Sequence, residues 1–167
     1  MNKETEQSLK AAFAGESQAH IKYLSFAARA ESEGKGNVAR LFRAVSFAEQ
    51  MHAGGHLRVL GGVGGTADNL AAAIGGETFE VNEMYPAYIA QAVEQGEKSA
   101  QRSMTWALEA EKVHAQFYQR AEGAADSGTD VQMGPVHVCG VCGWTGEGEA
   151  PDRCPLCGAA KEKFVIF

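Results

Sequence analysis

Hydrophobic residues recur at intervals of three and four along much of the chain, which is the period of an amphipathic helix. Between the helical stretches lie glycine-rich breaks, and Pro86 falls inside the third stretch, where it is expected to begin a helix or kink one already started. The four stretches are residues 9–33, 37–59, 79–93 and 97–122. Four amphipathic helices of this length predict a helix bundle.

The segments between the helices predict how the bundle is connected. Asn37 is the expected N-cap of the second helix. Residues 60–77 are rich in Gly and Ala, too long for a tight hairpin and compatible with a crossover along the bundle, which favours ferritin-like topology. After the fourth helix the composition shifts to Gly, Asp, Ser and Thr. We therefore predict a bundle over 1–123, a linker over 124–135 and a small β-rich module over 136–167.

Composition and charge narrow the range of binding partners that the chain could have. The chain has 167 residues, 45% of them hydrophobic, and a formal net charge of -6. An acidic chain lacks the clustered Lys and Arg on which nucleic-acid affinity depends. No apolar run reaches the roughly 20 residues that span a membrane, and the polar N-terminus does not resemble a signal peptide. We expect a cytoplasmic protein that binds neither nucleic acid nor membrane.

Glutamates stand where the helical period calls for apolar residues. An unpaired buried carboxylate costs several kcal/mol, so several glutamates converging on one core are explained by bound cations. These glutamates are Glu16, Glu49, Glu80, Glu83 and Glu111.

Two helices repeat one local motif, Glu49-x-x-His52 and Glu111-x-x-His114. A spacing of three places carboxylate and imidazole on the same helix face, and carboxylates with one imidazole per metal suit a pair of iron or manganese ions. Ferritin-like di-metal proteins combine two such motifs with one glutamate from each of two further helices, and the first and third helical stretches supply these glutamates. His20 and His56 lie outside the repeated motif and are interpreted as supporting or surface histidines.

The tail carries two Cys-x-x-Cys pairs. Four thiolates hold one tetrahedral metal, and in a chain without export signals this favours metal ligation over disulfides. The tail alone does not distinguish iron from a structural zinc, but an iron centre tethered to a di-iron site has a use in delivering electrons. The ligands are Cys139, Cys142, Cys154 and Cys157.

Together these segments resemble the rubrerythrin family over essentially the whole chain. The resemblance is carried by Gly15-Glu16-Ser17-Gln18-Ala19, Glu49-Gln50-Met51-His52, Glu80-Val81-Asn82-Glu83-Met84-Tyr85-Pro86, Glu111-Lys112-Val113-His114 and the two cysteine pairs. It implies a ferritin-like di-iron domain followed by a rubredoxin-like domain with one iron.

The resemblance also implies a role for each ligand. Glu49 and Glu111 would bridge the irons, with Glu16 and Glu80 as terminal ligands and His114 on the iron held by Glu80. Glu83 would be the additional carboxylate that alternates with His52 as the redox state changes, and Tyr23 a hydrogen-bond donor beside the site. Zinc substitution at either site would leave the fold unchanged.

In that family the di-iron site reduces hydrogen peroxide to water in oxidative-stress defence, which implies a peroxidase fed through its own rubredoxin-like iron. The external donor would be a rubredoxin or flavoprotein reductase drawing on NAD(P)H. The family also implies a homodimer, and domain exchange through the 61–76 connection is left open.

Two other functions fit the same residues less fully. A ferroxidase or iron-handling protein would oxidise ferrous iron and bind the product, but it has less use for a tethered electron-transfer centre. A metal-stabilised scaffold with zinc in the tail would have no redox role. Metal analysis and visible absorption separate the scaffold from the other two.

Overall fold

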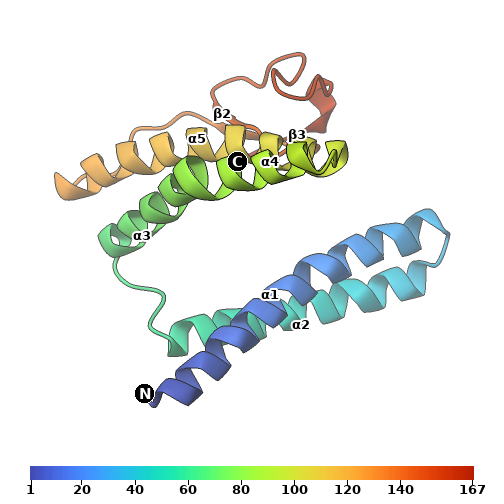
Figure 1. Cartoon of the computed structure of the whole chain (residues 1–167), viewed down its shortest axis with the longest axis horizontal. Helices are drawn as coiled ribbons and strands as arrows, with labels where there is room; N and C mark the ends of the chain where they lie inside the picture. The colour runs from blue at the N-terminus through green and yellow to red at the C-terminus, as the bar shows by residue number, and fades with distance from the viewer. The chain divides into compact units, whose positions relative to one another are not determined.

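The computed structural model describes residues 1–167, and most of them are helical (Figure 1). Four long helical runs are followed by a small antiparallel sheet, which confirms the predicted mainly helical fold class. The helices are α1 (Lys3–Ser32), α2 (Gly36–Val59), α3 (Thr66–Phe79), the π-helix η1 (Glu80–Met84), α4 (Tyr85–Glu94) and α5 (Lys98–Asp126). None of them is long and apolar enough to cross a membrane.

Local capping explains where α1 begins and where α1 and α2 end. The Asn2 side chain accepts a hydrogen bond from the Glu4 N–H at 2.9 Å, and so caps α1. Gly34 and Gly61 have φ of 71°, a left-handed conformation that favours glycine at a helix C-terminus. Asn37 is not the N-cap that we predicted, because α2 already begins at Gly36 with Lys35 as its cap.

The predicted crossover over 60–77 is wrong in most of its length, because α3 begins at Thr66. The segment is rich in Ala, the strongest helix former, and the backbone of Gly65 bonds to the Asp68 side chain in a capping box. Its two glycines at 75 and 76 lower the helical propensity without ending the helix. Only residues 60–65 remain to connect α2 to α3.

Pro86 neither breaks the third helical run nor ends it. The run passes through five π-helical residues, and the Tyr85 N–H donates to the Glu80 carbonyl. A proline lacks the N–H that a continuous α-helix needs, and α4 begins with Pro86 in its first turn, where that N–H is not required. Such π-helical turns occur often at functional sites, and this one contains Glu80.

The chain divides into two compact units, Met1–Gly64 and Gly65–Phe167. The first unit is the hairpin of α1 and α2. Its fully buried positions are small residues, and the Ser46 hydroxyl donates to the His20 carbonyl at 2.9 Å across the two helices. They are Ala27, Ala30, Ala39, Ser46 and Ala53.

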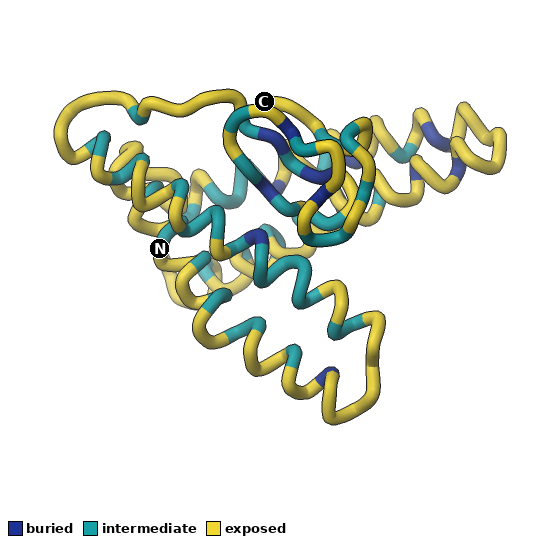
Figure 2. Tube along the Cα trace, turned by 90° about the horizontal axis from the view of Figure 1, so that it is seen from above, coloured by how far each residue is buried: buried dark blue, intermediate teal, exposed yellow.

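The second unit packs α3 and α4 along α5 and carries the small sheet, whose strand order is β2-β1-β3. The strands are β1 (Val136–Cys139), β2 (Thr145–Glu147) and β3 (Phe164–Ile166), and both pairings are antiparallel. The rings of His137, Trp144 and Phe164 lie 5.3 to 6.3 Å apart between centroids. Figure 2 shows several buried positions in the coil near the C-terminus.

Within the second unit, the helix and strand ends around the predicted linker differ slightly from the predicted bounds. Helix α5 continues to Asp126, inside the predicted linker 124–135, while β1 begins at Val136. The Ser127 hydroxyl donates to the Ala124 carbonyl at 2.8 Å and so caps the end of the helix.

A substitution at Gly140 tests how tightly the small sheet is packed. A methyl group there would lie 2.9 Å from the Lys163 carbonyl oxygen, which belongs to the backbone. We expect Gly140→Ala to destabilise the module by about 1–3 kcal/mol. The measurement is thermal unfolding followed by near-UV circular dichroism of Trp144 in a Trp106→Phe background. Gly123→Ala, whose new methyl group meets nothing within 4 Å, is the control; equal melting of the two variants would contradict the packing.

Candidate metal centres

The four cysteines form one cluster, as predicted. Their sulfurs all lie within 4.8 Å of one another, and no disulfide links them. The Sγ atoms of Cys139 and Cys157 are 3.7 Å apart, and those of Cys142 and Cys154 are 3.6 Å apart. Tetrahedral coordination with metal–sulfur bonds of about 2.3 Å requires edges of about 3.8 Å. The cluster therefore has the dimensions of a four-thiolate metal site.

Two backbone turns position the sulfurs. The Gly143 N–H donates to the Cys139 carbonyl at 2.9 Å, and the Gly158 N–H donates to the Cys154 carbonyl at 2.8 Å. Both glycines have positive φ, 79° and 75°, which lets the chain fold back behind each cysteine pair. Burial raises the pKa of the Cys139 thiol, but hydrogen bonds from the Val141 and Cys142 N–H groups and from the Cys157 and Cys142 thiols lower it to about 7. Burial raises the pKa of the Cys142 and Cys157 thiols. The turns thus favour a thiolate at Cys139, and a bound metal would displace the protons of the other two.

The first unit holds one carboxylate and histidine group, formed by three predicted ligands. Glu16 comes from α1, Glu49 and His52 come from α2, and their ligand atoms lie within 4.8 Å of one another. His52 Nδ1 is 3.1 Å from Glu49 Oε2. The His52 side chain is 58% exposed, whereas that of Glu49 is 16% exposed.

The second unit holds a matching group that includes a residue we did not predict. Glu77 of α3 lies with Glu111 and His114 of α5, again with ligand atoms within 4.8 Å. His114 Nδ1 is 2.6 Å from Glu111 Oε2. Glu80 is half-buried and interacts electrostatically with Glu111 and His114, whereas Glu83 is exposed and outside the group.

The electrostatics of the second group suit a bound cation. Glu77 Oε2 is buried and has no hydrogen-bond partner. Burial and the neighbouring Glu111 and Glu80 carboxylates raise the pKa of Glu77 to about 7. Burial and the charge of Glu111 also raise the pKa of Glu80. Carboxylates gathered in this way repel one another, and hard divalent cations are the partners that relieve the repulsion.

Comparison with known proteins agrees with both centres. Residues 7–122 match the family model for rubrerythrin, and residues 137–165 match the model for the rubrerythrin rubredoxin-like domain. The chain belongs to the rubrerythrin family.

Curated relatives match this chain over nearly its full length. Rubrerythrin-2 of Clostridium acetobutylicum is 41% identical, over 99% of this chain and 98% of its own. Nigerythrin of Nitratidesulfovibrio vulgaris is 34% identical, over 98% of this chain and 86% of its own. A solved structure of fully reduced, all-ferrous nigerythrin has a TM-score of 0.57 at 34% identity, with 98% of this chain and 86% of that chain covered.

Sequence reasoning missed Glu77 because it assigned that residue to the crossover. The signal was present as a run of glutamates spaced by three, Glu77, Glu80 and Glu83. Once α3 begins at Thr66, the pair that faces α5 is Glu77 and Glu80 instead of Glu80 and Glu83. The spacing alone cannot distinguish these two registers, since both pairs are three residues apart.

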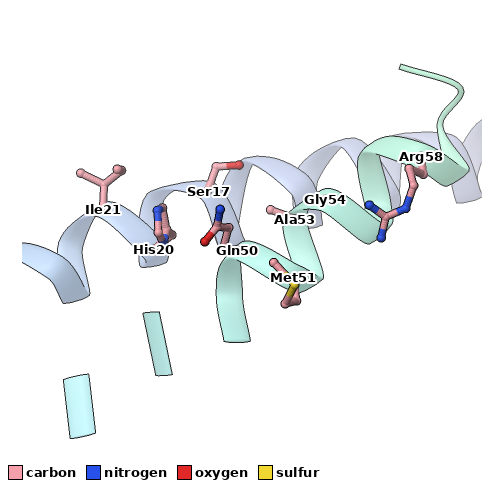
Figure 3. A pocket seen from close by; sticks show the side chains of 8 residues that line it. All are labelled: Ser17, His20, Ile21, Gln50, Met51, Ala53, Gly54 and Arg58. Atoms are coloured by element: carbon pink, nitrogen blue, oxygen red, sulfur yellow. The ribbon is translucent and has the colours of Figure 1, made fainter. Parts of the chain in front are cut away.

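The other predicted residues lie in the α1–α2 hairpin. The ring of Tyr23 packs with those of Phe26 and Phe42, at 6.1 Å from each. His20 Nδ1 is 2.9 Å from the Ser46 carbonyl oxygen, so this histidine links the two helices. His20 lines a cavity of about 550 Å³, and none of the predicted ligands does. Figure 3 shows the side chains that line it.

Replacing Glu77 tests whether the ligand pair is Glu77 and Glu80 or Glu80 and Glu83. We expect Glu77→Gln to lower the affinity of the carboxylate site for iron by at least about tenfold, because an amide is a weaker ligand than a carboxylate. The matched control is Glu83→Gln, which should keep the wild-type iron content. The measurement is iron per chain after dialysis at graded concentrations of chelator. Loss of iron in the Glu83 variant, with full iron in the Glu77 variant, would restore the original ligand prediction.

Proposed function

We propose that this rubrerythrin-family protein is a hydrogen peroxide reductase in which electrons pass from the four-cysteine iron to a carboxylate-bound di-iron site. One molecule of hydrogen peroxide takes up two electrons and two protons and yields two molecules of water. The observation that carries the proposal is a direct contact between the two centres: His114 Nε2 lies 2.8 Å from Thr145 Oγ1, a hydroxyl of the rubredoxin-like module.

The direction of this hydrogen bond follows from the second bond that Thr145 makes. Its hydroxyl donates to the Gly143 carbonyl at 3.0 Å, so its oxygen accepts from the His114 Nε2–H. His114 Nδ1 lies 2.6 Å from Glu111 Oε2, a hydrogen-bond distance, so a proton lies between the two atoms unless a metal takes its place. A metal bound there would be held by Nδ1, and the hydrogen bond at Nε2 orients the ring.

The same hydrogen bond supports a short route for electrons. Thr145 is 5% exposed and follows Cys142 by three residues. The chain from a cysteine ligand to the His114 ring therefore consists of covalent bonds and one hydrogen bond. A structural zinc module would have no need of such a connection to a metal ligand.

An ion pair supports the same docking of the module on α5. The Arg120 guanidinium lies 2.6 Å from the Glu147 carboxylate of β2. The Gly134 N–H also donates to Glu147 at 2.7 Å, and this bond together with Arg120 holds the pKa of Glu147 below its usual range. An exposed ion pair adds little stability, but it helps to fix the orientation of the strand that carries Thr145.

The charge of the proposed ligand set suits a change of iron oxidation state. When bound, the iron pair would supply two electrons together to the peroxide bond, and the cysteine iron would replace them one at a time. Five carboxylates contribute a charge of about −5, against about +4 for two ferrous and +6 for two ferric ions. The site thus stays within about one charge of neutrality in both states. The carboxylates are Glu16, Glu49, Glu77, Glu80 and Glu111.

An external protein must supply the electrons, and the cysteine cluster offers an edge for it. Val141, between Cys139 and Cys142, is 51% exposed, and Cys142 and Cys157 are half-buried. A small apolar contact of this kind suits the weak, transient docking of a rubredoxin or a flavoprotein reductase.

The proposal predicts the response of the fully reduced, iron-loaded protein to two oxidants. Mixed with hydrogen peroxide in the absence of oxygen, the cysteine iron should reoxidise at least about tenfold faster than with oxygen alone, because peroxide accepts the electron pair at the di-iron site. Stopped-flow visible absorption measures both rates. Faster reoxidation by oxygen would favour the ferroxidase.

Replacing Thr145 tests the route between the centres. We expect Thr145→Val to slow reoxidation of the cysteine iron by peroxide about 10–100-fold, because His114 loses its hydrogen-bond acceptor. Thr145→Ser keeps the hydroxyl and should restore the rate. Iron content and the visible spectrum of the cysteine iron, measured on the same samples, report loss of metal separately. An unchanged rate in the valine variant would exclude this route.

A further inference from the structure

We propose that an acidic one-electron carrier protein docks where the second cysteine loop, residues 154–157, meets the start of α5, and that Lys98 and Arg102 pair with its carboxylates. The carrier is a small protein of the rubredoxin class, which holds one iron between four cysteines. The inference rests on the proposed function for the need of an external electron donor. It goes beyond that function by assigning the surface and the charges that select the donor.

A hollow of about 480 Å³ lies between the second cysteine loop and the first turns of α5. Leu156 of the loop lines it, together with α5 residues that include Lys98, Arg102 and Trp106. None of the lining side chains is fully buried, so the hollow suits side chains of a transient protein partner better than an enclosed small molecule. A protein seated here would lie against the loop that carries two of the four predicted iron ligands.

The lysines and arginines of α5 divide into a paired and an unpaired half. Lys112 and Arg120 each lie 2.6 Å from a carboxylate. Lys98 and Arg102 are exposed and take part in no ion pair of the chain. No carboxylate lines the hollow, and Glu97, which precedes Lys98, lies outside its lining. In a chain with a formal net charge of -6, these two cations decide where an acidic partner can approach.

Local structure prepares both cations for carboxylates. The guanidinium carbon of Arg102 lies 5.6 Å from the centre of the Trp106 ring, a cation–π contact that holds the arginine beside the hollow. The N–H groups of an arginine held in this way can bind a carboxylate through two parallel hydrogen bonds. Lys98 is the first residue of α5, where the positive end of the helix dipole adds to its attraction for anions.

The docking surface lies apart from the route by which electrons leave the cysteine iron. That route passes through Thr145 to His114, which follows Arg102 by twelve residues on the same helix. Twelve residues correspond to about 18 Å along α5, so a docked carrier leaves the His114 contact uncovered.

One electron passes in each encounter, from the ferrous iron of the carrier to the ferric iron of the four cysteines. The carrier leaves in the ferric state, the cysteine iron becomes ferrous, and no proton is transferred. Two encounters therefore supply the two electrons that one molecule of peroxide takes up.

Zinc-loaded protein reports docking without electron transfer. The isotope-labelled, zinc-loaded chain is titrated at low ionic strength with a zinc-substituted rubredoxin of net negative charge, and amide chemical shifts are followed by NMR. We expect the shifts to concentrate in the first turns of α5 and in the second cysteine loop, with little change in the α1–α2 hairpin. Shifts that are absent, or that centre on the hairpin, would overturn the inference.

Reversing the two charges tests whether they carry the docking. In a variant with Lys98→Glu and Arg102→Glu these shifts should vanish. Peroxide should also oxidise excess reduced rubredoxin about 10–100-fold more slowly through the iron-loaded variant at low ionic strength, because attraction becomes repulsion. The matched control carries Lys22→Glu and Arg40→Glu, two exposed hairpin positions that change the net charge equally. An equal loss in the control would show that net charge sets the rate, and would contradict the assigned surface.

A cationic donor separates lost docking from a damaged iron centre. Reduced methyl viologen carries positive charge, so the reversed variant should accept its electrons at least as fast as wild type does. Slower reduction by viologen as well as by rubredoxin would overturn the assignment of docking to these charges.

Failure of the proposed function gives a different result. Fully reduced wild-type protein whose cysteine iron peroxide does not reoxidise would overturn the peroxidase, while the zinc titration would still decide the docking surface. A flavoprotein reductase that reduces the cysteine iron faster than rubredoxin, and loses this advantage in the reversed variant, would assign the surface to the flavoprotein and overturn the choice of carrier.

Discussion

The repulsion among buried carboxylates is the constraint on which the helical part of this protein depends. Glu77 has a buried oxygen without a hydrogen-bond partner, and its pKa is raised to about 7 by burial and by the Glu111 and Glu80 carboxylates. A core of this kind is unfavourable until a cation enters it, because the desolvation of each charge must be offset locally. Metal binding and the packing of α3 against α5 are therefore coupled.

Local spacing explains why much of the site could be predicted from the sequence. Each Glu-x-x-His motif lies within one helical turn, and each cysteine pair lies within one backbone turn, so neither depends on how distant segments pack. Glu49, His52, Glu111, His114 and the four cysteines were identified on that basis, and Glu16 from its place on the apolar stripe of the first helix; all of them lie in three compact groups.

The features that sequence reasoning missed are those that depend on where a helix begins. The Ala-rich segment before Glu77 has no apolar stripe strong enough to mark a helix start, and Gly75 and Gly76 weaken it further. Placing the start at Thr66 changes both conclusions drawn from this region. It brings Glu77 into the site, and it shortens the connection to α2 from a crossover to six residues, 60–65.

The second unit combines two tasks that the fold could have separated. His114 shares its α5 helix turn with Glu111, and its other nitrogen meets Thr145 of the rubredoxin-like module. One imidazole thus links the carboxylate and histidine group of α3 and α5 to the rubredoxin-like module within a single compact unit.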